Sequence, residues 1–281
     1  MMAQYKIYLE TSVIIGAVQQ SLIIQDYYLQ DLIKRKLIKQ SDMYTASQEF
    51  LDYILLNKKH DLEPLISFMV KYEIRNLMSK KTQMEEKIIN KIKIFAEIKK
   101  LPIDDQKTIN LLLYRIFFIK LPSLTYDLID NFTSISVDEK AVEFTRDEIF
   151  ERVYRPLLRR LKYLKVYFET KGLPEEKLSK DQDYPEYIQL KKGLRTFQEF
   201  GDYNKITDLL ILAEAIVTFN KLITEMKDLP IFYFVSCDTI FVPFKESGSM
   251  FFKIRDNIEK SFGIKVGTPK FVLGTLTSSS H

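Results

Sequence analysis

The sequence predicts an α/β fold, with three α/β/α layers around a central parallel sheet. Apolar runs at Tyr5–Leu9 and Ile231–Ser236 have the nearly continuous hydrophobicity of strands that are buried on both faces. Each run is followed within two residues by an acid, Glu10 or Asp238. Because the ligand crevice of an open parallel sheet lies beyond the carboxyl ends of its strands, these two acids are expected to face one pocket.

The expected elements of the first half alternate between strands and helices. After the first strand come a helix at about Val13–Gln20 capped by Thr11 and Ser12, a helix at about Gln25–Lys39, a short strand at Met43–Thr45 and a helix at Ala46–Asn57. From about Asp61 to Lys120 the pattern is helical, without a strand, and is broken at Pro102.

The second half returns to alternating strands and helices, which favours a parallel sheet covered on both faces. The first expected elements are a strand at Phe132–Val137, a helix opened by Asp138 and Glu139 that runs to about Arg155, and a kink or new helix at Pro156. A flexible loop at Gly172–Pro185 is expected next, followed by helices at Glu186–Phe200 and Asn204–Thr224. The last expected elements are the strand at Ile231–Ser236, a helix at Met250–Phe262, a strand at Ile264–Val266 and an apolar tail at Lys270–Leu276. We expect residues 1–60 and 130–281 to form the α/β core, residues 61–129 a helical insertion, and residues 156–200 a further helical and loop insertion.

Composition limits the class of protein. With 281 residues, of which 46% are hydrophobic, the chain has enough material for a substantial core. Its single cysteine, Cys237, excludes an internal disulfide framework, and one cysteine with two histidines cannot supply the usual ligands of zinc. A metal would therefore be held by oxygen, the preference of Mg²⁺ and Mn²⁺. No membrane span or signal peptide is apparent, so a cytoplasmic location without a membrane partner is expected.

Four acids are the candidate site: Glu10, Glu49, Asp208 and Asp238. Asp52, one helical turn after Glu49, competes for the fourth position. Clustered carboxylates repel one another unless a cation joins them. Each acid also has a structural explanation, because Glu10 and Asp208 sit where a carboxylate stabilises a helix N-terminus, Asp238 is placed to form a turn, and Glu49 is typical of a helix surface.

Basic residues gather in two stretches, residues 71–100 and 151–171. The second stretch mixes cations with Tyr and Phe in Arg152–Phe168, a combination that suits contacts with the phosphates and bases of single-stranded RNA. A solvated helix face, with the aromatic residues in the core, is the alternative explanation. Cys237 lies beside Asp238 but lacks a nearby histidine in the sequence, so a packed thiol is expected rather than a nucleophile.

In their order and spacing, these segments resemble the PIN-domain nucleases. The motifs that carry the resemblance are Glu10-Thr11-Ser12 followed by Val13-Ile14-Ile15, the helix segment Asp208-Leu209-Leu210-Ile211-Leu212-Ala213-Glu214-Ala215, and Ser236-Cys237-Asp238-Thr239-Ile240-Phe241. The likeness covers roughly residues 4–57, 132–155 and 200–273. At position 10 the family usually has Asp, whereas this chain has the longer Glu.

The resemblance implies a catalytic set of Glu10, Glu49, Asp208 and Asp238, with Glu10, Asp208 and Asp238 as ligands of Mg²⁺ or Mn²⁺. It also implies that Thr11 and Ser236 support the bound ion or a substrate phosphate through hydrogen bonds.

The implied function is a metal-dependent endoribonuclease that hydrolyses phosphodiester bonds of single-stranded or structured RNA, with DNA as the other substrate class. A catalytically inactive PIN-like protein that binds RNA or acts as a scaffold is the alternative. A toxin of a toxin–antitoxin pair, with an antitoxin-like or other partner protein, is one expectation from the family. Such toxins are usually compact, and the helical additions of this chain also suit RNA processing or defence. A homodimer through Lys270–Leu276 or the insertion helices is a further expectation.

Overall fold

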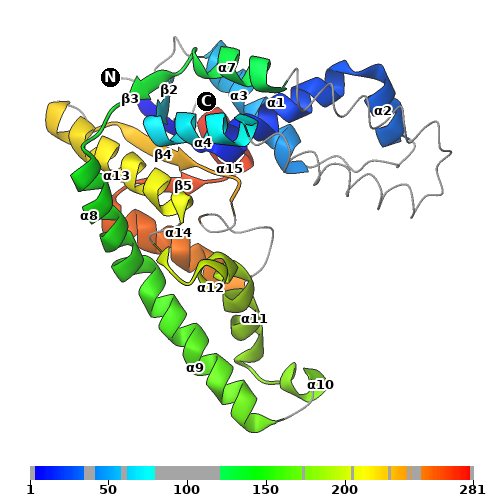
Figure 1. Ribbon diagram of the computed structural model, residues 1–281, viewed down its shortest axis with the longest axis vertical. Coiled ribbons are helices and arrows are strands. Elements are labelled where there is room, and N and C mark those ends of the chain that lie inside the picture. Colours follow the sequence, from blue (N-terminus) through cyan, green and yellow to red (C-terminus); the bar gives the residue numbers. More distant parts are fainter. Residues whose placement is uncertain are drawn as a thin grey trace. The chain divides into compact units, whose positions relative to one another are not determined.

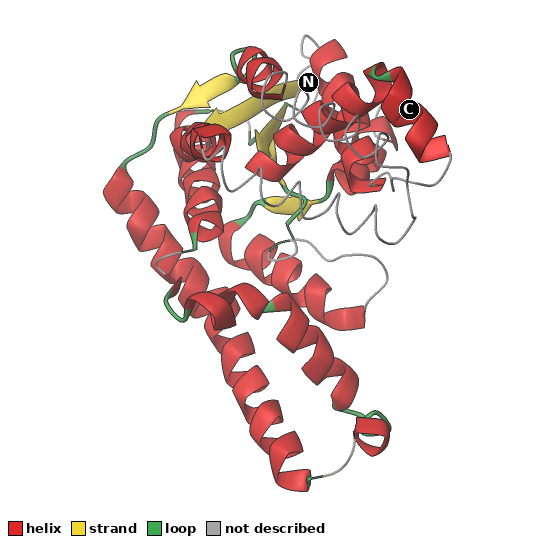
Figure 2. Cartoon of the chain, turned by 45° about the vertical axis from the view of Figure 1, so that its right-hand side comes forward, coloured by secondary structure: helices red, strands yellow, loops and turns green. Residues whose placement is uncertain are grey.

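A parallel β-sheet lies at the centre of the fold. The computed structural model describes residues 4–34, 42–57, 62–79, 121–172, 175–203, 206–226, 229–238, 241 and 248–278. Five strands, β1 (Tyr5–Leu9), β2 (Leu62–Ser67), β3 (Thr133–Ile135), β4 (Ile231–Val235) and β5 (Lys265–Gly267), form one sheet in the order β3-β2-β1-β4-β5. All five strands are parallel, and helices predominate in the rest of the described chain (Figure 2). The predicted three-layer α/β/α class is therefore confirmed.

Strands β1 and β4 form where the sequence predicts them, because their apolar runs can be buried. Ile7, Tyr8 and Leu9 of β1 are fully buried, as are Phe234 and Val235 of β4. Strand β5 then pairs with β4 in parallel, with Phe234 opposite Val266 and Val235 opposite Gly267. Strands buried in this way read as continuous hydrophobic runs, and this is why the sequence alone revealed them.

Two predictions near the start of the chain are wrong. Met43–Thr45, expected as a strand, lies within helix α3 (Asp42–Leu56). Strand β2 lies in a segment expected to be helical throughout. This strand contains Pro64, which has no N–H for a strand ladder. Because proline is uncommon inside a sheet, the sequence did not predict a strand here. The predicted helical break at Pro102 lies outside the described residues.

The chain divides into two compact units. Unit 1 comprises Met1–Tyr8 and Ile135–Thr268, and unit 2 comprises Leu9–Ser134 and Pro269–His281. This division differs from the predicted core at residues 1–60 and 130–281, but the predicted domain boundaries stay a prediction. None of the helices in the described part of the chain is long and apolar enough to cross a membrane.

Unit 1 is mostly helical outside its strands (Figure 1). Its helices are α8 (Glu139–Ile149), the π-helix η2 (Phe150–Tyr154), α9 (Arg155–Lys171), α10 (Glu175–Leu178), α11 (Tyr184–Gly193), α12 (Arg195–Phe200), α13 (Thr207–Glu225) and α14 (Gly248–Phe262). Asp138 caps α8 as predicted, with its carboxylate accepting a hydrogen bond from the backbone N–H of Ala141 at 3.3 Å.

Pro156 explains the π-helix in the middle of this long helical segment. A proline lacks the N–H that would donate to the carbonyl four residues earlier, and it is tolerated best in the first turn of a helix. Here it lies in the first turn of α9, and just before it the backbone N–H of Arg155 donates to the carbonyl of Phe150, five residues back. The wider turn therefore joins α8 to α9 around the missing donor.

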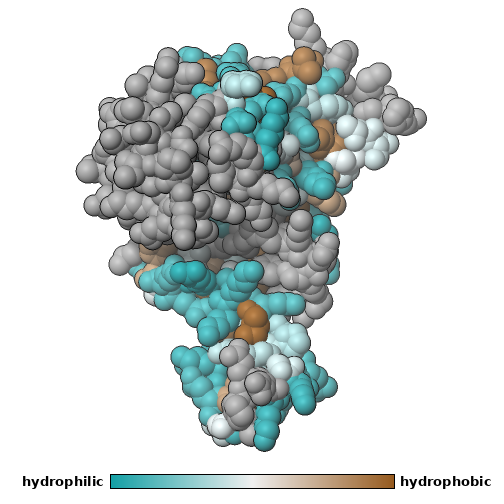
Figure 3. Space-filling model, turned by 90° about the vertical axis from the view of Figure 1, so that its right-hand side faces the viewer, coloured by the Kyte–Doolittle hydropathy of each residue, from teal (hydrophilic) through white to brown (hydrophobic). Residues whose placement is uncertain are grey.

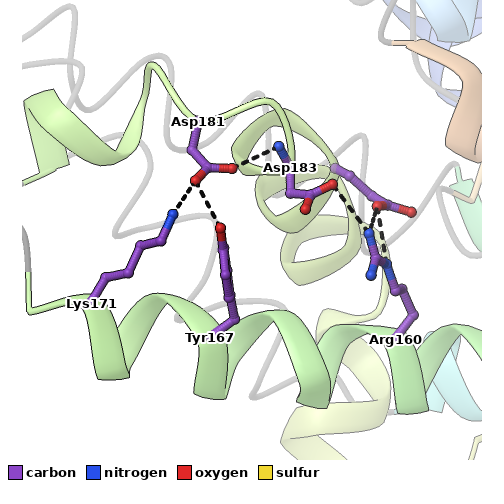
Figure 4. Close-up of polar contacts among 6 residues, drawn as sticks. Arg160, Tyr167, Lys171, Asp181 and Asp183 are labelled. Carbon is purple, nitrogen blue, oxygen red and sulfur yellow. Dashed lines mark hydrogen bonds and ion pairs between the residues drawn. The ribbon is translucent and has the colours of Figure 1, made fainter.

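Helix α9 is fastened to the segment before α11 by an ion-pair network (Figure 4). Asp181 accepts hydrogen bonds from Lys171 and Tyr167, and the backbone N–H of Asp183 donates to it at 3.0 Å. The hydrogen bond from Lys171 is the main reason that the pKa of Asp181 lies below its ordinary value. Arg160 bridges to Asp183 and, at 2.7 Å, to Glu186 of α11. The expected flexible loop at Gly172–Pro185 thus contains α10 and the anchored start of α11.

Unit 2 packs its helices around α1. Its helices are α1 (Thr11–Gln25), α2 (Tyr27–Lys34), α3, α4 (Phe68–Ser79), α7 (Leu121–Ile129) and α15 (Pro269–Ser278). Helix α1 packs against α3 and α7, and α15 packs against α3. The predicted apolar tail at Lys270–Leu276 is therefore helical, and its Val272 and Leu276 are buried inside the unit.

We expect Gly16 to be required for the close approach of α1 and α3. A Cβ atom at Gly16 would lie 2.9 Å from Cδ1 of Tyr44, whereas a Cβ at Gly274 in α15 would meet no atom within 4 Å. Gly274→Ala should raise the free energy of unfolding by about 0.5–1 kcal/mol through helix propensity, and Gly16→Ala should lower it by about 1 kcal/mol through overpacking. Urea denaturation followed by circular dichroism measures both, and equal stability of the two variants would contradict the tight contact.

Candidate active site

Asp238 is held in a turn directly after strand β4. Its backbone N–H donates to the hydroxyl of Ser236 at 2.9 Å, and its carbonyl accepts from the backbone N–H of Phe241 at 3.2 Å. The backbone N–H of Ser236 donates to the carbonyl of Gly267 in β5 at 3.1 Å, and Ser236 is fully buried. Ser236 thus fixes the backbone that carries Asp238. The Asp238 side chain remains half-buried.

Asp208 lies in the first turn of α13. Ile206, the residue before this helix, makes no side-chain cap, so Asp208 supplies the negative charge that the N-terminal N–H groups favour. The Asp208 side chain is half-buried, while Leu209, Ile211 and Leu212 of the same helix are fully buried. The buried residues fix α13 in unit 1 and leave its first turn accessible.

The charges of both aspartates affect the pKa of one residue, Tyr154. It is fully buried at the end of η2, and its pKa lies well above the ordinary value of a tyrosine. Burial is the largest cause, followed by the negative charges of Asp208 and then Asp238. Two carboxylates that raise the pKa of one buried phenol must both lie within electrostatic range of it. Unit 1 therefore brings Asp208 and Asp238 into one neighbourhood.

An aromatic cluster holds Tyr154 in this position. The rings of Phe150 and Tyr203 stack with centroids 3.9 Å apart, and the Tyr154 ring lies 4.6 Å from that of Phe197. Phe197 comes from α12, and Tyr203 from the loop that leads into α13. Because stacked and tilted ring pairs add to the energy of buried area, this cluster stabilises the position of Tyr154.

In unit 2, Glu10 is the N-cap of α1. Its carboxylate accepts a hydrogen bond from the backbone N–H of Ser12 at 2.9 Å and another from the Ser12 hydroxyl. The Thr11 hydroxyl donates to Glu73 of α4. The prediction that Thr11 and Ser12 cap this helix is wrong, because the acid before them does so. The hydrogen bonds with Ser12 are those expected of a carboxylate at a helix N-terminus, which is the structural explanation of Glu10.

Glu49 and Asp52 are both exposed on α3. The opposite face of this helix is buried through Ser47, Phe50 and Ile54. The choice between Glu49 and Asp52 as the fourth acid stays open. With Glu10, they belong to unit 2, whereas Asp208 and Asp238 belong to unit 1.

Asp208 and Asp238 supply carboxylate oxygens, the kind of ligand that magnesium and manganese prefer. Mg²⁺ commonly keeps several waters and binds through one or two carboxylates. Both carboxylates are half-buried, so solvent reaches them. Across the described residues, no three His, Cys, Asp or Glu side chains are grouped as ligands of a metal ion. The metal role of Glu10, Asp208 and Asp238 therefore stays a prediction.

Three polar residues near the predicted acids, Tyr154, Glu214 and Glu73, were not predicted as site residues from the sequence. Tyr154 lies in the basic and aromatic stretch Arg152–Phe168, but its burial and the effect of the two aspartates on its pKa were not predicted. Glu214 is buried in α13, where it accepts a hydrogen bond from the Tyr8 hydroxyl at 3.3 Å. A glutamate inside the run Ile211–Ile216 was a usable signal, since a buried glutamate requires a partner. Glu73 lay in the predicted insertion. Cys237 is a buried free thiol, as expected.

Comparisons of this chain with family models, with curated proteins and with solved structures find no match. The resemblance to the PIN-domain nucleases stays a prediction.

We expect the Tyr154 phenol to make stability depend on pH in the alkaline range. An unfolded tyrosine ionises near a pKa of about 10, whereas the folded protein holds this proton more tightly. The stabilisation from the protonated phenol is therefore fully present below about pH 10. It is lost as the pH rises from there toward the higher pKa that Tyr154 has in the folded protein. Between about pH 9 and pH 11, the free energy of unfolding should fall more steeply for the wild type than for Tyr154→Phe, measured by urea denaturation.

The exposed Tyr163 provides the control for this measurement. Tyr163→Phe removes a phenol that is 59% exposed, and it tests whether loss of any tyrosine hydroxyl alters the measurement. Asp208→Asn should lower the pKa of Tyr154 in the folded protein, because it removes one of the two charges that raise this pKa. The same slope in the wild type and in Tyr154→Phe would contradict the assigned electrostatic environment.

Proposed function

We propose that the chain is a metal-dependent endoribonuclease, which hydrolyses phosphodiester bonds of RNA with Mg²⁺ or Mn²⁺. The observation that carries this proposal is the pair of half-buried carboxylates, Asp208 and Asp238, which act together on the buried Tyr154. The sheet supports the choice of Asp238, because this acid follows shortly after the carboxyl end of the parallel strand β4. In open parallel sheets, ligands bind beyond the carboxyl ends of the strands.

The two aspartates would hold the cation through their oxygens, directly or through water. Bound there, the ion would supply an activated water and neutralise the charge that grows on the phosphate. Tyr154 is kept neutral by its burial, so its hydroxyl acts as a hydrogen-bond donor and not as a base. Ser236 keeps the backbone of Asp238 in place through its hydroxyl. The role of Tyr154 requires a protonated phenol, and its raised pKa keeps the phenol protonated near neutral pH.

The proposed partners follow from the same resemblance. RNA is the proposed substrate and DNA the other nucleic acid to be tested. An antitoxin-like partner protein and a homodimer are further proposals. The burial of Val272 and Leu276 within unit 2 leaves Phe271 as the exposed apolar residue of α15, with 49% of its surface accessible. A homodimer through this tail would therefore depend on Phe271.

We expect Asp208→Asn to abolish cleavage of single-stranded RNA in the presence of Mg²⁺ or Mn²⁺. Loss of a metal-holding charge removes several kcal/mol of transition-state stabilisation, which is a fall in rate of about 100-fold or more. Asp238→Asn should have a similar effect. The exposed Glu143 on α8 gives the matched control, and Glu143→Gln should cleave like the wild type. Cleavage of a fluorescently labelled RNA by purified protein, with EDTA as a blank, measures these rates.

Metal binding can be measured without turnover. Mn²⁺ should raise the melting temperature of the wild type and of Glu143→Gln, because an ion that binds the folded state stabilises it. It should have a smaller effect on Asp208→Asn. Equal cleavage by Asp208→Asn and the wild type would eliminate the metal mechanism. A wild-type protein that binds RNA but never cleaves it would instead support the inactive RNA-binding alternative.

A further inference from the structure

A basic groove lies in unit 1 where α11 is followed by α12. It is a cavity of about 490 Å³, which we call the α11–α12 groove, lined by Ile188, Lys191, Lys192, Arg195, Gln198 and Glu199. Figure 3 shows a mostly hydrophilic surface over the helical part of unit 1, with a small hydrophobic area in it. None of the acids predicted for the active site lines the groove.

The groove has an excess of positive charge. Three of its lining side chains are cations, and one is a carboxylate, Glu199, whose Oε1 lies 2.6 Å from Nε of Arg195. Among the described residues, neither Lys191 nor Lys192 has a carboxylate within ion-pair distance. The ammonium of Lys191 instead lies 6.0 Å from the centre of the Tyr187 ring. Two positive charges therefore remain available to an anionic ligand.

The groove also offers apolar surface beside its charges. Ile188 is 40% exposed, although large aliphatic side chains are usually buried. The amide of Gln198 is turned back onto the chain, where its nitrogen donates to the carbonyl of Lys191 at 3.2 Å. This hydrogen bond closes the corner between the two helices. A ligand that combines regular negative charge with flat apolar surface matches this lining, and single-stranded nucleic acid has both.

Both helices that form the groove are fixed to the rest of unit 1. The Phe168 ring of α9 contacts the Tyr184 and Tyr187 rings of α11, with centroids 5.4 Å and 5.2 Å apart. Helix α12 is anchored by the buried Phe197, which packs on Tyr154. The cations are therefore presented on a supported surface, which reduces the conformational entropy lost on binding.

We infer that the α11–α12 groove binds the phosphate backbone of single-stranded RNA through Lys191, Lys192 and Arg195. Ile188 supplies apolar contact for a base. The inference rests on the proposed function for its choice of RNA, and it adds a substrate-binding surface to the proposed catalytic acids. Phe197 gives the groove and Tyr154 a common support, because it belongs to α12 and contacts the Tyr154 ring.

The test compares two triple variants that lose the same charge. The groove variant is Lys191→Gln, Lys192→Gln and Arg195→Gln, and the control is Lys140→Gln, Lys221→Gln and Lys260→Gln, three exposed lysines of unit 1. Binding of a fluorescein-labelled single-stranded RNA to the full chain is followed by fluorescence anisotropy in EDTA, which prevents metal-dependent cleavage. The melting temperature of each variant confirms that it is folded.

We expect the groove variant to bind RNA about tenfold more weakly, or worse, and the control to bind like the wild type. Each phosphate contact contributes about 0.7 to the slope of log K against log salt for a single strand, so the loss of three contacts should reduce the slope by about 2. Poly-glutamate of equal charge should displace the RNA less well than unlabelled RNA does.

Three results would overturn the inference: no binding of RNA by the wild type, equal weakening by both triple variants, or equal competition by poly-glutamate. These outcomes are separate from the failure of the proposed function. An inactive protein whose RNA binding depends on the groove would disprove the nuclease and keep the groove. A protein that cleaves RNA through Asp208, with binding unchanged in the groove variant, would do the reverse.

Discussion

The missing N–H of Pro156 is the constraint around which unit 1 is arranged. A helix from Glu139 to Lys171 without that donor must change its hydrogen bonding, and it does so in the π-helix η2. Single π turns inside helices are rare, and those that occur are often found at functional sites. Here the turn contains both Phe150, which stacks on Tyr203, and Tyr154, which packs on Phe197. One backbone adjustment therefore supports the helices that carry Asp208 and the basic groove.

The environment of Tyr154 has a consequence for the neighbouring charges. A buried phenol beside two carboxylates is held in its neutral form, and a neutral phenol can donate but carries no charge that would repel the carboxylates. The backbone of Asp238 is held in place by two hydrogen bonds: its N–H donates to the Ser236 hydroxyl, and its carbonyl accepts from the N–H of Phe241.

How much the sequence could predict depended on whether a signal was local. Strands β1 and β4 are buried on both faces and were evident as apolar runs, whereas β2 was concealed by Pro64. The acids at strand and helix ends were found because each follows an apolar run or begins a helical pattern in the sequence. Tyr154 and Glu214 were not singled out, because their importance comes from tertiary contacts between segments that are distant in sequence. For Glu10 the sequence left two explanations open, and the contacts with Ser12 describe the structural one.

The position of β1 within the sheet has a practical consequence for protein engineering. This strand consists of residues 5–9, yet it lies between β2 and β4, and the carbonyl of Gln4 accepts a hydrogen bond from the backbone N–H of Ile231 at 2.9 Å. Removing β1 would uncover the edge of β4, whose side chains are almost entirely apolar. An uncovered apolar edge strand pairs readily with other molecules and leads to aggregation. Deletion of β1 is therefore a route to insoluble protein.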